Sequence, residues 1–301
     1  MNGVTPLPAL GVIKITGEDA AKFIHGQLTQ DFALLGQDEA RLSAFCSAKG
    51  RMQASFIGFK RPNGDVLLVG SADLLPATAK RLAMFVMRAK AKVSDASDEY
   101  ALWGLAGSAI QQIAAPSDSV WSKADIGEVS VVNLYPALGT KRQLWVAPAG
   151  TAVPLGDDLN PSLWRWSEVH SGIATLSLPV VDAFVPQMLN YESVGGVNFQ
   201  KGCYPGQEVV ARSQFRGTLK RRAYLVHSMN AIQAGDSVFI PSDSDQPVAT
   251  VVQSAASPTG GHDAIISGQN AAIQAGPLHL GTAQGTPLVL LPLPYPLLED
   301  I

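Results

Sequence analysis

The sequence predicts an α+β protein of several domains that ends in a small antiparallel β-barrel. A chain of 301 residues exceeds what one hydrophobic core usually serves. Its first half alternates short apolar strands with amphipathic helices, and from Ala223 onward short apolar runs alternate with Gly, Pro, Ser and Asp. We expect domains at 1–98, 99–222 and 223–301, with one continuous domain over 1–222 as the alternative.

Composition narrows the classes of function. The hydrophobic content of 47% is typical of a globular protein, and a net charge of −3 provides no global field that attracts nucleic acid. The chain has two cysteines, Cys46 and Cys203, and no Cys-x-x-Cys pair. A four-cysteine zinc or iron–sulfur site is therefore excluded, and we expect no stably bound metal.

The sequence predicts neither a secretory signal nor a membrane-spanning segment. Residues 1–10 lack a basic region followed by an apolar run, so they do not form a secretory signal. The longest apolar stretch, 287–298, is interrupted by four prolines and is too short to cross a bilayer. We expect a cytoplasmic monomer.

The first unit is expected to mix strands and helices. Strands are predicted at 12–15, 41–45, 52–59, 66–69 and 90–95, with a hairpin turn at Asn63-Gly64. Thr16 is predicted to cap a helix whose apolar face carries Ala20, Phe23, Ile24 and Leu28 and which ends near Gly26. Asp73 is predicted to begin a longer helix with Pro76 in its first turn, lined by Ala79, Leu82, Ala83 and Val86.

The second unit continues this pattern from residue 100. A helix is expected near 108–114, with strands near 129–135 and 142–146 and a helix over 163–170. That last helix carries Trp164 and Trp166, which either pack in the core or form an aromatic wall against a flat heterocycle. The long loop from Gly172 to Asn190 is of a kind that is often functional.

The densest group of reactive side chains lies at Lys201–Glu208. Pro205 and the flanking glycines prevent a regular element over 202–206, and a helix is predicted to begin at Gln207. A helix start and Lys201 would both favour the thiolate form of Cys203. Gln207 and Glu208 add polar groups that need partners, although a buried cysteine that only packs is the alternative.

A basic run follows the predicted helix. Arg212, Arg216 and Arg221, with Lys220 and Arg222 beside them, could form an anion site for phosphate or carboxylate groups. A solvated helix end is the alternative.

The segment Lys201–Glu208 resembles the Lys-Gly-Cys-Tyr-x-Gly-Gln-Glu hallmark of the YgfZ family, folate-binding relatives of the glycine-cleavage T-protein. The resemblance extends over nearly the whole chain, including 46–51, 185–190, 195–199, 215–221 and 292–299. It implies a T-protein-like multidomain fold with a C-terminal barrel and a central channel where tetrahydrofolate can bind.

The resemblance also implies roles for individual residues. Trp164 matches a tryptophan associated with folate binding, whereas Leu10 stands where the family has a second one. Further folate contacts are expected from Tyr204, Gln187 and Asn190. Activity in the family depends on the cysteine that matches Cys203. The family supports iron–sulfur enzymes, including one that thiomethylates tRNA, and such client enzymes are the expected partners.

Two other functions were weighed. A folate-dependent aminomethyltransferase uses an aspartate about four residues after the glycine of the strand–turn–strand element. Counting from Gly50 gives Ala54 and Ser55, which argues against that chemistry. Direct tRNA binding through the basic run is opposed by the acidic overall charge and by the lack of an exposed aromatic module. We therefore expect an accessory protein that maintains iron–sulfur clusters and thereby supports tRNA modification.

Overall fold

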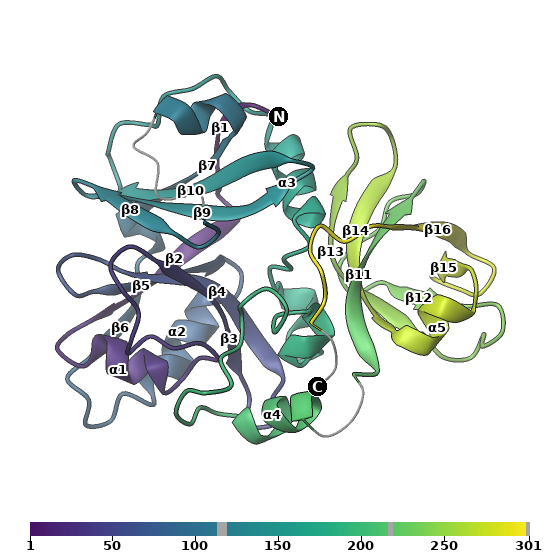
Figure 1. The fold of residues 1–301 in the computed structure, drawn as a ribbon, viewed down its shortest axis with the longest axis horizontal. Helices are drawn as coiled ribbons and strands as arrows, with labels where there is room; N and C mark the ends of the chain where they lie inside the picture. Colours follow the sequence, from purple (N-terminus) through teal and green to yellow (C-terminus); the bar gives the residue numbers. More distant parts are fainter. Residues whose placement is uncertain (113–118, 216–218, 299–301) are drawn as a thin grey trace.

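The computed structural model describes residues 1–112, 119–215 and 219–298, and it divides into two packed sheets and a separate barrel (Figure 1). Each sheet has five strands, and the barrel is closed and antiparallel. The predicted α+β class with a C-terminal barrel is confirmed. The bounds of the three proposed domains stay a prediction.

The first sheet holds most of the strands predicted for the N-terminal unit. Its order is β3 (Ala40–Cys46), β4 (Met52–Lys60), β5 (Val66–Ser71), β2 (Leu10–Thr16) and β6 (Lys92–Asp95). In β5 the side chains alternate between two cores: Leu67 and Val69 face the second sheet, and Val66 and Leu68 face the helices. Burial on both faces explains its nearly continuous apolar sequence.

The second sheet contains a strand from the start of the chain. Its order is β1 (Gly3–Pro6), β7 (Tyr100–Ala106), β10 (Thr140–Pro148), β9 (Val129–Ala137) and β8 (Lys123–Ile126). Nothing in the sequence analysis identified β1, which pairs antiparallel with β7 across about a hundred residues. A shared core that includes Val12, Leu67, Val132 and Leu144 joins the two sheets.

The first two helices are shorter than predicted. Helix α1 (Ala20–His25) ends at Gly26 as expected, but Thr16 does not cap it. Gly17, at φ +107°, turns the chain after β2, and Asp19 is the N-cap residue, with its carboxylate accepting from Lys90 N. Helix α2 (Leu75–Ala83) begins two residues after Asp73, whose carboxylate instead accepts from Leu178 N.

Among the described residues between 97 and 215, two helices and several short 3₁₀ helices connect the strands of the second sheet to one another and to the barrel. The helix expected near 108–114 is the 3₁₀ helix η2 (Gly107–Gln112), and residues 113–114 lie outside the described ranges. A 3₁₀ turn η1 (Ser97–Glu99) precedes β7. Helix α3 (Pro161–His170) is capped by the Asn160 side chain, which accepts from Ser162 N. The turns η3 (Leu178–Val180) and η4 (Pro186–Leu189) follow, and helix α4 (Gln207–Phe215) begins at the predicted residue.

The barrel contains every strand predicted after Ala223. Its order is β11 (Arg221–Ser228), β14 (His262–Gln269), β13 (Ala249–Ala256), β12 (Ser237–Phe239), β15 (Leu278–Leu280) and β16 (Thr286–Leu291), and α5 (Asn270–Ala275) follows β14. Pairing of β16 with β11 closes the barrel, so these two strands leave no open edge.

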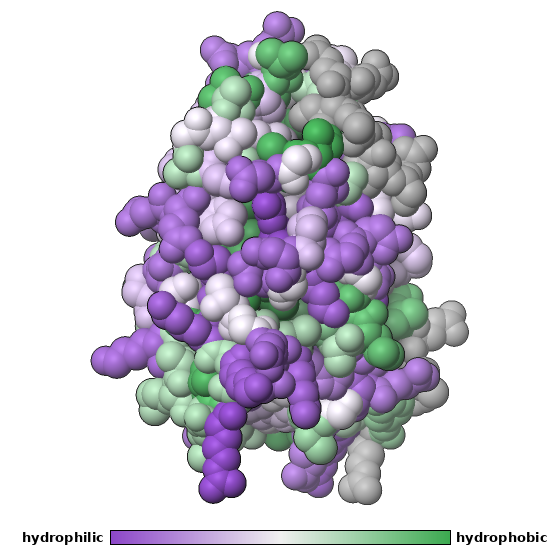
Figure 2. Space-filling view, turned by 90° about the vertical axis from the view of Figure 1, so that its left-hand side faces the viewer, coloured by the Kyte–Doolittle hydropathy of each residue, from purple (hydrophilic) through white to green (hydrophobic). Residues whose placement is uncertain are grey.

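The C-terminal segment returns from the barrel along its junction with the sheets, where it is drawn in yellow (Figure 1). The Tyr295 hydroxyl donates to Gly172 O at 2.8 Å and thereby fixes this segment. On the face shown in Figure 2, hydrophilic residues predominate and apolar ones form small groups. In the part of the chain that the structure describes, no helix is long and apolar enough to cross a membrane.

Candidate functional site

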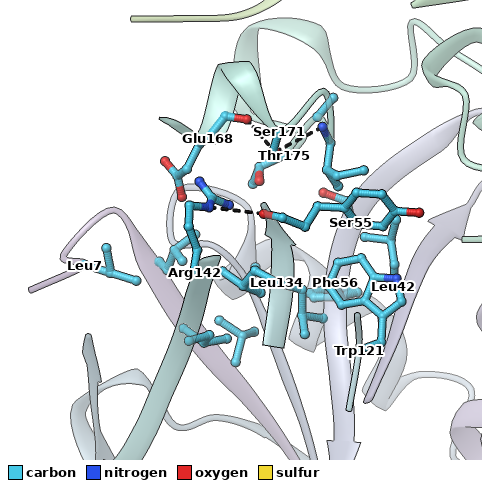
Figure 3. A pocket seen from close by; sticks show the side chains of 18 of the residues that line it. Leu7, Leu42, Ser55, Phe56, Trp121, Leu134, Arg142, Glu168, Ser171 and Thr175 are labelled. Carbon is cyan, nitrogen blue, oxygen red and sulfur yellow. Dashed lines mark hydrogen bonds between the residues drawn. The ribbon is translucent and has the colours of Figure 1, made fainter. Parts of the chain in front are cut away.

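Two adjoining cavities lie where α3 covers the ends of the two sheets. The inner one, of about 50 Å³, is lined by aromatic residues and by a few polar groups (Figure 3). The outer one, of about 290 Å³, opens between the chain start and α3. Both are lined by Leu7, Leu10, Trp164, Glu168 and Thr175. The outer volume is at the lower end of what small-molecule sites usually offer.

A cation and an acid face each other in the inner cavity. Arg142 donates to Ser167 Oγ at 2.8 Å and to Tyr135 O at 3.3 Å. Burial lowers the pKa of Arg142 to about 10, although Glu168 opposes the shift. Burial also raises the pKa of Glu168, against the opposing effects of Arg142 and the Trp164 indole. The cavity therefore offers a fixed donor group and a carboxyl that keeps its proton to a higher pH than usual.

Trp164 lies in the position expected for a residue of the cavity wall. Its side chain is buried, and the Arg142 guanidinium lies 4.8 Å from its ring centroid. Gly104 of β7 permits this packing, since a Cβ there would lie 2.6 Å from the indole. The indole N–H is buried and makes no hydrogen bond of normal geometry. Leu10, which stands where the family has a second tryptophan, lines the same cavities.

The residues of this site suit a reduced folate. A pterin presents adjacent N–H donors and a carbonyl acceptor, which match the carboxylate of Glu168 and the guanidinium of Arg142. Trp164, Trp121, Tyr135 and Tyr191 supply the aromatic lining. The Trp164 N–H, which lies near Glu168 but makes no hydrogen bond of normal geometry, offers one more donor to a ligand.

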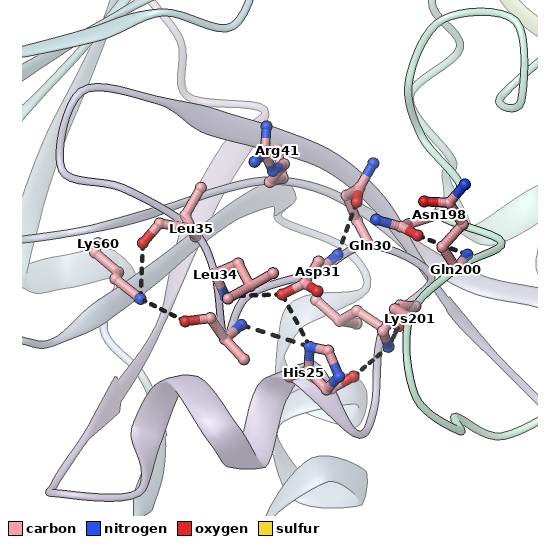
Figure 4. A network of polar contacts seen from close by, with 12 residues as sticks. His25, Gln30, Asp31, Leu34, Leu35, Arg41, Lys60, Asn198, Gln200 and Lys201 are labelled. Atoms are coloured by element: carbon pink, nitrogen blue, oxygen red, sulfur yellow. Dashed lines mark hydrogen bonds and ion pairs between the residues drawn. The ribbon is translucent and has the colours of Figure 1, made fainter.

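The segment Lys201–Glu208, here called the signature loop, is clamped to the residues that follow α1 (Figure 4). Lys201 Nζ donates to the carbonyls of His25 and Leu28, where α1 ends. Gln30 Nε2 donates to Gly195 O at 2.7 Å, and Asn198 N donates to Thr29 O at 2.9 Å. These contacts fix the chain on the approach to Cys203.

Lys201 therefore has a structural position that the sequence did not reveal. Burial lowers its pKa to about 8, although the charges of Asp31 and Cys203 oppose the shift. Its ammonium also lies 4.7 Å from the ring centroid of Tyr204. Lys201 is within electrostatic reach of Cys203, but its hydrogen bonds go to backbone carbonyls.

A histidine and an aspartate stand beside the loop. His25 Nδ1 lies 3.1 Å from Asp31 Oδ1, and a Cβ at Gly202 would lie 3.5 Å from His25 Nε2. Hydrogen bonds from Leu34 N and from His25 hold the pKa of Asp31 below its usual value, despite an opposing effect of burial. The sequence analysis did not single out Asp31, because its pairing with His25 depends on the turn after α1.

The two cysteines occupy opposite environments. Cys203 is exposed, whereas Cys46 at the end of β3 is buried. Burial, with a smaller effect from Asp182, raises the pKa of Cys46 to about 12, so this thiol stays protonated. Cys203 does not line either cavity at α3, so these cavities and the exposed thiol are separate features of the molecule.

The other expected folate residues lie away from these cavities. The buried amide of Asn190 bonds both backbone groups of Ala223 and thereby joins η4 to β11. Gln187 is also buried, and its Nε2 donates to Val210 O at 2.7 Å. Tyr204 packs in the main core, where burial raises its pKa. None of these three lines the two cavities near α3.

The remaining predicted residues are distributed around α4. Gln207 Nε2 donates to Lys201 O at 3.4 Å, which closes the signature loop on itself. Glu208 and Arg212 are exposed and line one shallow hollow. Arg221 is half-buried and lies on another side of α4, in a groove lined by Lys220. Arg216 lies outside the described residues.

Several residues of the sites described above were missed by the sequence analysis. Arg142 and Glu168 occur in ordinary strand and helix patterns, and neither belongs to a motif. Only the packing of α3 on β10 brings them together. Both sequence patterns contained a usable signal, namely a charged residue among apolar neighbours, because such a residue needs a partner when it is buried.

Known proteins similar to this chain are named for tRNA modification. The chain is 32% identical to the tRNA-modifying protein YgfZ of Cronobacter sakazakii, over 74% of this chain and 71% of that protein. It is 31% identical to the protein of that name from Colwellia psychrerythraea, over 74% and 70% of the two chains. No family model matches the chain.

Among solved structures, the chain is similar to the glycine cleavage system aminomethyltransferase T of Bartonella henselae. The TM-score is 0.69, with 14% identity, over 97% of this chain and 86% of that one. This similarity confirms the predicted T-protein-like fold. At that identity it carries no information on activity.

Proposed function

The chain belongs to the YgfZ family, and on that premise we propose that it supports tRNA modification as a folate-binding accessory protein of iron–sulfur enzymes. In this proposal the cavities at α3 bind a tetrahydrofolate, and the Cys203 thiol engages the sulfur, iron or one-carbon species that the client enzyme needs. The observation that carries it is an acid, a guanidinium and a tryptophan converging on an aromatic cavity, in a molecule that also exposes one thiol.

The cavity favours binding over aminomethyl transfer. The strand position that would hold the transferase aspartate contains Ala54 and Ser55, both buried in β4. Ser55 lines the inner cavity, and its hydroxyl accepts from Leu176 N at 2.9 Å. A hydroxyl engaged in this way is a poor substitute for a carboxylate that activates a folate nitrogen.

The exposed thiol supports a role in contact with a partner. Cys203 is presented on a loop whose backbone is fixed on the side of α1 by Lys201 and Asn198. An exposed sulfur on a fixed loop can reach a group carried by another protein, whereas the buried Cys46 cannot.

Folate binding is tested by a calorimetric titration of the full chain with tetrahydrofolate. Glu168→Gln removes the charge without changing the volume, and we expect affinity to fall about tenfold because a charge-assisted hydrogen bond is lost. Glu128→Gln on the exposed turn before β9 is the matched control. No binding by the unaltered protein, or equal affinities in all three proteins, would contradict the proposed site.

The role of the thiol is tested in a strain that lacks the gene. We expect Cys203→Ser to fail to restore tRNA thiomethylation and iron–sulfur enzyme activity, because a hydroxyl at neutral pH is a far weaker nucleophile and ligand than a thiolate. Cys46→Ala, which removes the buried thiol, should restore both. Full restoration by Cys203→Ser would show that the thiol has no such role.

A further inference from the structure

A groove beside α4 does not have Cys203 among its lining residues, and neither the family resemblance nor the proposed function assigns it a role. It has a volume of about 390 Å³ and is formed by η4, by α4 and by the start of β11. Its polar side chains come from Gln187, Ser213, Lys220, Arg221 and Gln269. Val185, Met188 and Leu219 supply apolar walls.

The groove carries positive charge without an acidic partner. No carboxylate is among the described residues that line it. Among the described residues, Arg221 donates one long bond, at 3.4 Å, to Ser267 O. Burial, with a smaller effect from the nearby Arg51, lowers the pKa of Arg221. Arg51 itself donates to Ala183 O, a neutral acceptor. Two guanidinium groups whose acceptors are neutral carbonyls give this region a positive potential, which favours the binding of an anion.

The walls of the groove are held by hydrogen bonds. Asn270 donates from Nδ2 to Leu219 O at 2.6 Å and from its backbone N to Lys220 O at 2.9 Å. Ser267 Oγ donates to Met188 O at 2.9 Å, which fixes η4 against the barrel. The cations therefore project from a supported backbone, which reduces the entropy lost when a ligand binds.

A buried acceptor without a partner also lines the groove. Gln187 is fully buried, and the bond from its Nε2 to Val210 O fixes the orientation of the amide. Its Oε1 then has no hydrogen-bond partner among the described residues. A buried acceptor in this state is stabilised by any donor that reaches it.

We propose that this groove binds a phosphomonoester of nucleotide size. Arg221 and Lys220 bind the phosphate, and the charge of Arg51 adds to the positive electrostatic potential there. The apolar walls contact the base. A donor of the ligand, such as a sugar hydroxyl or a base amino group, bonds Gln187 Oε1. The same group occurs on a free nucleoside monophosphate and at the 5′ end of an RNA. This inference does not depend on the roles of Cys203 or of the folate cavities.

The test is a calorimetric titration of the full chain at low salt with AMP, with adenosine, and with a short RNA carrying a 5′ phosphate or a 5′ hydroxyl. We expect the phosphorylated ligands alone to bind, and Arg221→Gln to weaken them about tenfold. Arg81→Gln, which removes the same charge from the exposed face of α2, should leave affinity unchanged. Lys220→Gln gives a second variant at an exposed side chain with little risk to folding.

Each outcome decides the proposal. Binding of AMP that Arg221→Gln and Lys220→Gln weaken supports it with a free nucleotide as the ligand. Binding of the phosphorylated RNA alone, weakened by the same variants, supports it with an RNA end as the ligand. Equal affinity for phosphorylated and unphosphorylated ligands, equal losses in Arg221→Gln and Arg81→Gln, or no binding of any probe would overturn it.

Discussion

Lys201 illustrates how one residue of a motif can serve the fold and the site together. Its ammonium is buried against two backbone carbonyls after α1, which a helix end leaves without intrahelical partners. The same residue directly precedes Gly202 and Cys203, so its position determines where the thiol is presented. The cost of burying the ammonium is visible in a pKa lowered to about 8.

This lowered pKa predicts a pH-dependent contribution to stability. Between pH 8 and 10.5 the unfolded chain holds a proton on Lys201 that the folded chain releases, so folding is favoured as the pH rises. Because the group is partly solvated, we expect the free energy of unfolding to rise by about 1–2 kcal/mol relative to Lys201→Met across this window. Urea unfolding of both proteins at several pH values measures the difference. A difference that falls with pH would contradict the assigned burial.

At the scale of elements, the signature loop is defined by its contact with the turn between β3 and β4. Gly206 has φ +79°, and a Cβ there would lie 2.4 Å from Ser47 O and 2.6 Å from Gly50 Cα. Gly50, at φ +70°, in turn faces the Val209 side chain of α4. Two glycines thus allow two backbones to meet, and this contact sets the position of α4 and of the loop ahead of it.

A pair of substitutions separates two contributions to the loss of stability, the close contact at Gly206 and the positive φ of the residue itself. Gly206→Ala and Gly139→Ala both place an alanine at positive φ, which costs each about 1 kcal/mol. Only Gly206 has neighbours within 4 Å, so its variant should lose a further amount of about 1–3 kcal/mol. Chemical denaturation measures both variants. Equal losses would mean that the loop moves freely away from the turn.

At the scale of the whole molecule, one carboxylate of the barrel binds α3, in addition to the contacts that Asn190 and Ser267 make at the same junction. Asp263 of β14 accepts from Trp166 Nε1 at 2.6 Å, and it lies 2.7 Å from His170 Nε2 and 2.6 Å from His227 Nδ1. Two of these partners are on α3, the helix that also carries Trp164 and Glu168. The junction with the barrel therefore supports the wall of the two cavities at α3.

We expect Asp263→Asn to loosen this junction. An amide cannot accept from all three groups, so the free energy of unfolding should fall by about 2 kcal/mol at neutral pH. Burial raises the pKa of Asp263, but the hydrogen bonds from His170, Trp166 and His227 outweigh this effect and lower it. The stability that the carboxylate provides is therefore lost as the pH falls below 3.8, and the unfolding free energies of the unaltered protein and of Asp263→Asn become similar there. Denaturation at pH 7 and at acidic pH measures this, with the exposed Asp245→Asn as control.

Local patterns in the sequence predicted elements better than they predicted partners. The helix start at Gln207, the end of α1 at Gly26 and the six barrel strands follow from glycines, prolines and apolar periodicity, and the structure confirms them. Thr16 was wrongly expected to cap α1, because Gly17 turns the chain and moves the helix start to Ala20. The strand Gly3–Pro6 was missed because its partner lies about a hundred residues away.

The sequence by itself determined the class of fold, the loop that carries Cys203 and the exclusion of a metal site made of four cysteines of this chain, since these depend on residue identity and short-range spacing. Only the tertiary structure decided that Arg142 faces Glu168, that Lys201 bonds to carbonyls, and that Gln187 and Arg221 share a groove apart from the cavities at α3. Such pairs are set by the packing of elements far apart in the chain, and burial then determines their charge and their available hydrogen bonds.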